Sequence, residues 1–121
     1  FFALLFAGGH AVHELKDMES DRKTGLKTGA VLLGPKKIHT IGFLFFSLAT
    51  ALLIFSFQFD ALPENLFAPF LLPYPVAAVA FAVTARKELD EKTARVYRLI
   101  YRMAYFLAGV GFILLRFREL I

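Results

Sequence analysis

Long uncharged stretches constrain the fold of this 121-residue chain more than any other feature. Apolar residues dominate four segments: Phe1 to about Leu15, Ile38 to Phe59, Leu66 to Ala85 and Val96 to Leu115. A helix needs about 20 residues to cross the hydrocarbon core of a bilayer. The second and third segments have that length without a formal charge, and the fourth carries only Arg98 and Arg102 in its first turns. These segments predict an all-α, polytopic transmembrane bundle.

Composition excludes several other classes of protein. Hydrophobic residues make up 58% of the chain, against about 45–50% in ordinary soluble domains. Fifteen phenylalanines exceed what the interior of so short a soluble domain can bury, and they also argue against disorder. The absence of cysteine excludes disulfides and cysteine metal sites. In a membrane protein, the net charge of +4 is more typical of basic residues that set the orientation of the helices than of nucleic-acid binding.

The breaks between these segments predict four helices in one domain, over about 1–21, 37–59, 66–86 and 93–118. Gly34 and Pro35 separate the first element from the second. A short polar turn is expected over residues 60–65. Three prolines in the first half of the third helix, at positions 69, 73 and 75, should bend it.

Basic residues predict the orientation of these helices. The first loop contains Arg22, Lys23, Lys27, Lys36 and Lys37. The second loop has no lysine or arginine. The third loop and the turns after it contain Arg86, Lys87, Lys92, Arg95, Arg98 and Arg102. The positive-inside rule places the first and third loops in the cytoplasm and the N-terminus outside. We therefore expect a multi-pass protein of the cell's inner, cytoplasmic membrane.

The end of the first helix carries an acidic stripe. Glu14, Asp17 and Asp21 share one helix face, and His10 extends it by a turn. Carboxylates are hard oxygen ligands, and Mg²⁺ is usually held by one or two of them together with substrate phosphates. The following basic residues offer donors for phosphate oxygens. The pattern favours a magnesium–phosphate site, and its alternative is a helix end whose charges are simply solvated.

The stretch from Asp17 to Gly34 resembles the second aspartate-rich motif of the UbiA superfamily of intramembrane prenyltransferases. That motif reads roughly D-x-x-x-D, then K/R-x-G-x-K/R-T/S-x-A and a closing glycine. The matching positions here are Asp17, Asp21, Lys23, Gly25, Lys27, Thr28, Ala30 and Gly34. The family fold is a bundle of nine transmembrane helices in which this motif ends the sixth. Three apolar segments follow it here, as the resemblance implies.

The resemblance implies an Mg²⁺-dependent transfer of an isoprenyl group from a polyprenyl diphosphate to a hydrophobic acceptor, often aromatic, as in quinone biosynthesis. By the match, Asp17 and Asp21 would bind Mg²⁺ and diphosphate. Lys23 and Lys27 would lie in the cytoplasmic loop that caps the site, and Arg22 would contact the diphosphate. Glu14 is a weaker candidate for the metal. Gly25 is expected to supply a turn or a close backbone approach. Gly8-Gly9 is expected at a close helix contact, with space for a substrate as the alternative.

One family motif is missing from the sequence. Nothing matches the first motif, roughly N-D-x-x-D-x-x-x-D, on the family's second helix. Because the chain also starts without methionine inside an apolar run, we expect it to be the C-terminal part of a larger enzyme, inactive without the N-terminal helices. The alternatives are a non-catalytic, small multi-span membrane subunit or scaffold, and a small transporter. The acceptor and the prenyl chain length stay open.

Several other polar residues have two interpretations. His10 and His13 are suited to contact an acceptor or a diphosphate, or to hydrogen-bond between helices. Arg98 and Arg102 either face the diphosphate cavity or serve only the positive-inside rule. The stripe of Tyr97, Tyr101 and Tyr105 is more typical of helix packing than of a prenyl path.

Overall fold

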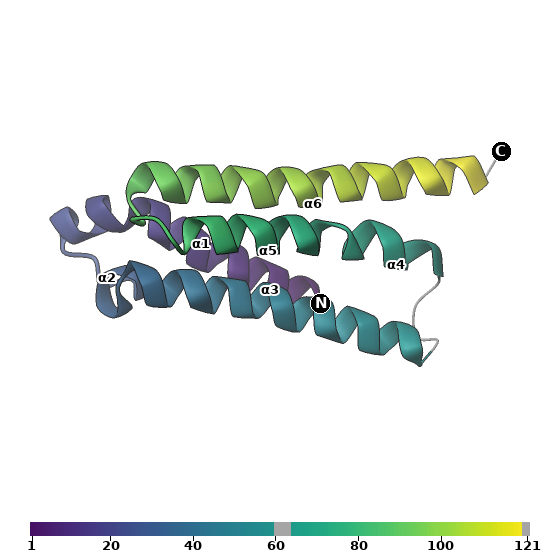
Figure 1. Ribbon diagram of the computed structural model, residues 1–121, viewed down its shortest axis with the longest axis horizontal. Helices are drawn as coiled ribbons and strands as arrows, with labels where there is room; N and C mark the ends of the chain where they lie inside the picture. Colours follow the sequence, from purple (N-terminus) through teal and green to yellow (C-terminus); the bar gives the residue numbers. More distant parts are fainter. Residues whose placement is uncertain (60–63, 120–121) are drawn as a thin grey trace.

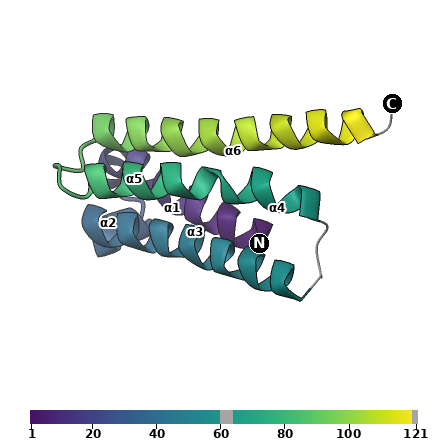
Figure 2. The same ribbon diagram turned by 45° about the vertical axis from the view of Figure 1, so that its right-hand side comes forward.

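The computed structural model describes residues 1–59 and 64–119, and these form helices without a strand among them. The helices are α1 (Phe2–Thr24), α2 (Gly29–Leu33), α3 (Pro35–Gln58), α4 (Glu64–Leu71), α5 (Pro73–Thr84) and α6 (Glu91–Glu119). Figures 1 and 2 show α1 and α3 running side by side, with α4, α5 and α6 beside them. The all-helical class predicted from the sequence is confirmed for the described residues.

Glycines shape the connection between α1 and α3. Gly25 follows α1 with a φ of 76°, in the left-handed region that glycine adopts without strain. Its N–H bonds to the carbonyl of Arg22, and the N–H of Leu26 bonds to that of Asp21, which closes the helix with a Schellman motif. Gly34, with a φ of 83°, separates the five-residue α2 from Pro35, the first residue of α3. The turn predicted at Gly25 and the break predicted at Gly34-Pro35 are therefore confirmed.

The predicted helix over 66–86 is wrong as a single element. It is divided into α4 and α5 at Leu72, because Pro73 and Pro75 have no N–H to donate to the preceding turn, although Leu72 itself keeps helical angles with φ −55° and ψ −34°. The expected bend is thus a break, with Pro73 as the first residue of α5. The first part of the turn expected at 60–65 lies outside the described residues. The helix expected over 93–118 begins earlier, at Glu91, because the carboxylate of Asp90 accepts the N–H of Thr93 at 2.8 Å and caps α6.

The closest helix contact joins α1 to α3. A Cβ on Gly8 would lie 2.8 Å from the Phe46 ring and 2.9 Å from the carbonyl oxygen of Gly42, so only glycine fits there. Val12, Phe46 and Tyr97 meet beside this contact, each at most 1% exposed. The close helix contact predicted for Gly8-Gly9 is confirmed at Gly8. Gly9 faces α6 instead, where the Tyr101 hydroxyl donates to its carbonyl at 3.4 Å.

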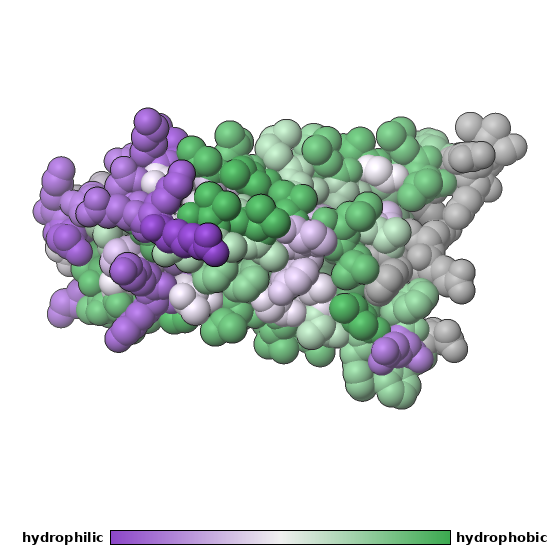
Figure 3. Space-filling model, in the orientation of Figure 1, coloured by the Kyte–Doolittle hydropathy of each residue, from purple (hydrophilic) through white to green (hydrophobic). Residues whose placement is uncertain are grey.

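Two helices are long and apolar enough to cross a membrane: α3 over its whole length and α6 over Glu91–Leu115. Only 28% and 6% of their apolar windows are buried within the molecule. Large hydrophobic side chains such as Leu48, Phe55 and Phe106 are exposed. Figure 3 shows most hydrophilic residues gathered at one end, over the C-terminus of α1, α2 and the α5–α6 loop. The two basic loops therefore lie at the same end of the molecule.

Candidate functional site

Asp17 lies in the C-terminal half of α1 between two basic partners. Its Oδ2 lies 2.7 Å from Nδ1 of His13, one turn earlier, and its Oδ1 lies 2.6 Å from Nζ of Lys16. About a third of the Asp17 side chain is exposed. Lys16 is thus a direct partner of the predicted site residue.

Glu14 reaches from α1 to the start of α2. Its Oε2 accepts the N–H of Ala30 at 3.0 Å, and its Oε1 lies 3.2 Å from Nε2 of His10. A Cβ on Gly29 would lie 2.7 Å from Oε2, so the glycine leaves room for this contact. A carboxylate at a helix N-terminus satisfies an N–H group that has no partner within the helix. Glu14 therefore holds α2, and with it the basic loop, against α1.

The remaining motif residues lie at the end of α1 and in the following loop. Asp21 is half-buried, and no ion pair of its carboxylate occurs among the described residues. Arg22 pairs with Glu19 at 3.5 Å on an exposed surface. Lys23 and Lys27 are exposed, and in the described part of the chain neither has an acidic partner. These cations are accessible to an anion from outside the chain.

The donor set suits Mg²⁺ only in part. Within residues 1–59 and 64–119, no three side chains of the metal-ligating types form a cluster that could hold a metal. Asp17 and Asp21 are one helical turn apart and offer the hard oxygen ligands that Mg²⁺ prefers. Two carboxylates are also as many as Mg²⁺ usually takes from a protein when substrate phosphates supply its other ligands. Both oxygens of Glu14 are engaged, one by the Ala30 N–H that it accepts between helices. Both oxygens of Asp17 are engaged as well, by Lys16 and His13, so Mg²⁺ would have to replace one of these partners at Asp17. Two aspartates fit one side of a magnesium–phosphate site, and Glu14 fits a structural role.

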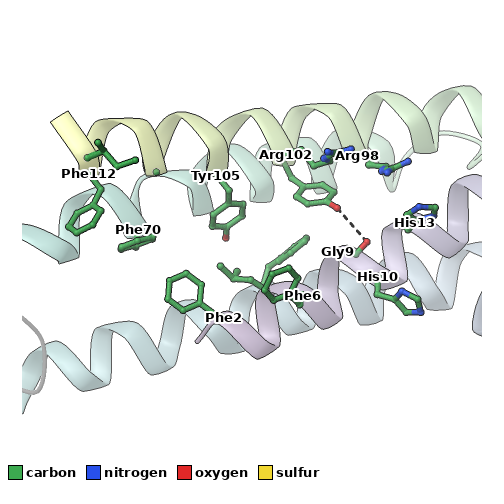
Figure 4. Close-up of a pocket in the computed structure, with 15 residues that line it drawn as sticks. Phe2, Phe6, Gly9, His10, His13, Phe70, Arg98, Arg102, Tyr105 and Phe112 are labelled. Carbon is green, nitrogen blue, oxygen red and sulfur yellow. Dashed lines mark hydrogen bonds between the residues drawn. The ribbon is translucent and has the colours of Figure 1, made fainter. Parts of the chain in front are cut away.

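A groove of about 930 Å³ runs between α1 and α6 and is lined also by Phe46 and Phe70. Figure 4 shows its two ends. At one end lie His10 and His13 from α1 and Arg98 and Arg102 from α6; this set is called the polar end below. The other end, called the aromatic end, is formed by Phe2, Phe70, Phe112 and Ile113, and Phe6 lies between the two ends. Asp17 and Asp21 do not line the groove, but His13, which does, contacts the Asp17 carboxylate and so links the polar end to the aspartate motif.

The lining of the groove bears on several residues for which the sequence left two interpretations open. The arginines predicted either to face the cavity or only to set topology do line the groove, opposite the two histidines. Tyr97 is fully buried and packs against His39 with ring centroids 4.8 Å apart, as its helix-packing interpretation predicts. Tyr101 and Tyr105 line the groove and also pack on Phe46. Sequence spacing contained the His13–Asp17 pair at i, i+4, but it contained no sign of the contact between Glu14 and α2.

No protein-family model matches this chain, and neither does any curated protein or solved structure. The assignment of function therefore rests on the residues of the motif and on the geometry around them.

Proposed function

We propose that this chain is the C-terminal part of an Mg²⁺-dependent intramembrane prenyltransferase, which moves an isoprenyl group from a polyprenyl diphosphate to a hydrophobic, aromatic acceptor. The proposal joins the resemblance of residues 17–34 to the site described above. Transfer requires a second aspartate motif, which these 121 residues do not contain. Activity is therefore proposed for a protein that supplies both motifs.

The observation that carries the proposal is the contact between His13, at the polar end of the groove, and Asp17. A polyprenyl diphosphate has a long apolar tail and a highly charged head. The groove offers aromatic walls at one end and cationic or imidazole groups at the other, and His13 at the polar end contacts the Asp17 carboxylate at 2.7 Å. A substrate with this division of charge fits the groove in one direction only.

The residues at the end of α1 have distinct roles in this proposal. Asp17 and Asp21 would hold Mg²⁺, which when bound neutralises charge on the diphosphate and so favours its departure. Lys23 and Lys27 are exposed at the same end and donate to phosphate oxygens, as Arg22 does once released from Glu19. Glu14 keeps the loop that carries Lys27 in place through the Ala30 N–H.

The same proposal includes a membrane arrangement. We propose that α1, α3, the broken pair α4–α5 and α6 each cross the bilayer, with the polar end of the molecule in the cytoplasm. This membrane arrangement is supported by the length of α3 and α6, by their exposed apolar side chains and by the position of both basic loops at one end of the molecule. Breaks such as that at Leu72 are tolerated in a membrane when neighbouring helices cover them, and both α3 and α6 contact α4.

The test uses membranes from cells that express the complete reading frame. Transfer of a labelled prenyl group to aromatic acceptors is measured with Mg²⁺ and with EDTA. We expect Asp17→Asn and Asp21→Asn each to lower the rate at least a hundredfold, because charge stabilisation at the leaving group is usually the largest catalytic contribution. Glu88→Gln is the matched control, since Glu88 is an exposed carboxylate in the α5–α6 loop at the same end of the molecule and has no ion pair among the described residues.

Two results would refute the proposed function. The first is unchanged transfer in both aspartate variants while the protein inserts normally. The second is a reading frame that starts close to Phe1, with no second aspartate motif upstream. The second result would instead favour the non-catalytic membrane subunit.

A further inference from the structure

A second hollow, of about 750 Å³, lies between α5 and α6 and is called the α5–α6 seam below. Figures 1 and 2 both show these two helices side by side. Aliphatic side chains form its walls: Val76, Val79 and Val83 from α5 and Val96 and Ile100 from α6. Each of them is between 36 and 65% exposed. The seam is therefore an apolar channel on the outer surface of the molecule.

Two lysines line the seam where it reaches the α5–α6 loop. Lys87 and Lys92 are both exposed, and neither forms an ion pair within the described part of the chain. Of the three carboxylates around this loop, Asp90 caps α6, Glu91 is held by an arginine of α6, and Glu88 does not line the seam. The seam thus combines two cations at one end with aliphatic walls beyond them.

The length of the seam matches one leaflet of a bilayer. Its lining on α5 runs from Thr84, next to the loop, to Pro75. Because a helix rises about 1.5 Å per residue, this stretch covers about 14 Å. The hydrocarbon core is about 30 Å thick, so one leaflet of it measures about 15 Å. A lipid whose head lies at the loop therefore has acyl chains about as long as the seam.

We propose that the α5–α6 seam binds an anionic bilayer phospholipid of the cytoplasmic leaflet. Lys87 and Lys92 hold its phosphate, and one of its two acyl chains lies along the valines. Lysine binds phosphate as a compact point charge, and its stem packs on apolar surface while its ammonium group reaches the headgroups. Basic pockets between membrane helices on the cytoplasmic side bind anionic headgroups in this way.

This lipid differs from the prenyl donor in its site and in its fate. It lies outside the groove between α1 and α6, and it is not consumed. The inference rests on the membrane arrangement proposed above, but on neither Mg²⁺ nor prenyl transfer. A zwitterionic phosphatidylcholine is disfavoured, because its own cation is repelled by the two lysines.

The first experiment compares two lipids that differ only in their headgroup. The complete protein is placed in phosphatidylcholine nanodiscs with EDTA. They contain a photoactivatable phosphatidylglycerol or a photoactivatable phosphatidylcholine with the same chains. Mass spectrometry measures labelling of residues 75–84 and 92–100. We expect phosphatidylglycerol to label them at least about fivefold more, and Lys87→Gln and Lys92→Gln each to weaken its labelling about fivefold, the contribution of one lysine at a membrane surface.

Arg86→Gln is the matched control for the charge of the loop. Arg86 is exposed and precedes Lys87, but it does not line the seam. Its removal should change labelling less than about twofold, because exposed charges outside a defined contact contribute little. An effect as large as that of Lys87→Gln would show attraction by total charge alone and overturn the inference. Equal labelling by the two lipids would overturn it as well.

The second experiment fills the seam. Val83 lines it and is 50% exposed, whereas the neighbouring Ala82 is exposed outside it. Val83→Phe should abolish the preferential labelling by phosphatidylglycerol, because the ring occupies the space of the acyl chain. Ala82→Phe should leave that labelling unchanged. Equal labelling in the two variants would place the lipid elsewhere and overturn the inference.

The result is separable from that of the transfer assay. Labelling is measured without Mg²⁺ or prenyl diphosphate, so it reports on the seam alone. Loss of transfer in Asp17→Asn and Asp21→Asn, together with equal labelling by the two lipids, would overturn only the lipid site. Selective labelling with unchanged transfer in both aspartate variants would overturn only the proposed prenyltransferase.

Discussion

The two neighbouring glycines of α1 face two very different helix contacts. At Gly8, α3 approaches so closely that a Cβ would overlap the Phe46 ring and the Gly42 carbonyl. At Gly9, the nearest groups are the hydroxyl and ring edge of Tyr101, and the space along α6 opens into the groove. Close packing supplies stability, whereas the groove leaves room for a ligand. One helix therefore combines a closed face, which fixes its position, with an open face, which carries the polar end and Asp17.

Phe46 supports both faces, and its removal should have the largest effect. Its side chain is 1% exposed, contacts α1 at Gly8 and packs on Tyr101 with ring centroids 5.1 Å apart. We expect Phe46→Ala to lower the free energy of unfolding by about 3 kcal/mol, as large buried aromatic losses do. Leu44→Ala is the control on the same helix, because Leu44 is 59% exposed. Equal losses in a detergent unfolding titration would contradict the assignment of Phe46 to the core.

Adding one methyl group to each glycine compares the two faces directly. We expect Gly8→Ala to cost about 2 kcal/mol, because a Phe46 ring and a backbone carbonyl must both move. Gly9→Ala should be close to neutral, since the group in its way is the end of the Tyr101 side chain at 3.1 Å. Thermal unfolding of the two variants measures the difference. A larger loss for Gly9→Ala would reverse the comparison.

The polar end of the open face depends on the contact between Glu14 and Ala30. Losing a hydrogen bond to a charged group costs about 1.5 kcal/mol, which is about a tenfold change in a local opening equilibrium. Glu14→Ala should therefore speed tryptic cleavage after the exposed Lys27 about tenfold while the global unfolding changes little. Glu19→Ala removes an exposed carboxylate from the same helix and should leave that cleavage rate unchanged. Equal rates in the two variants would show that Glu14 does not hold α2.

Local chemistry made much of the fold predictable. Apolar runs of helix length predicted α1, α3 and α6 to within a few residues, and Gly25 and Gly34-Pro35 predicted where chain direction changes. The exact effect of Pro73 was missed, because a proline can bend a helix or end it depending on what packs around it. The short α2 was missed as well. Its five residues are held from outside by Glu14, so no signal within them predicts a helix.

The candidate site was also predictable only where its contacts lie within one helix. Relations within one helix, such as His13 with Asp17, follow from a spacing of four residues. Relations between helices require the packing itself. Arg102 and His13 lie nearly ninety positions apart, and only the approach of α6 to α1 places both in one groove. The prenyl transfer itself stays a prediction, because it depends on a second motif outside these residues.

The smallest effect is expected at the start of α6, the helix that forms the second wall of the groove. Hydrogen bonds from the side chain and backbone of Thr93 lower the pKa of the Asp90 carboxyl from its ordinary value of 3.8. A pKa lowered by folding means that this cap stabilises fully above pH 3.8 and is lost as the pH falls through the lower, folded-state value. Helicity followed by circular dichroism from pH 6 to pH 2 should therefore fall slightly at the acid end. Asp90→Asn keeps a good N-cap without an acidic proton, so its helicity should lack this step. A step of the same size in Asp90→Asn would assign the acid transition to other carboxylates, with the Glu14 contact at the polar end as the next to test.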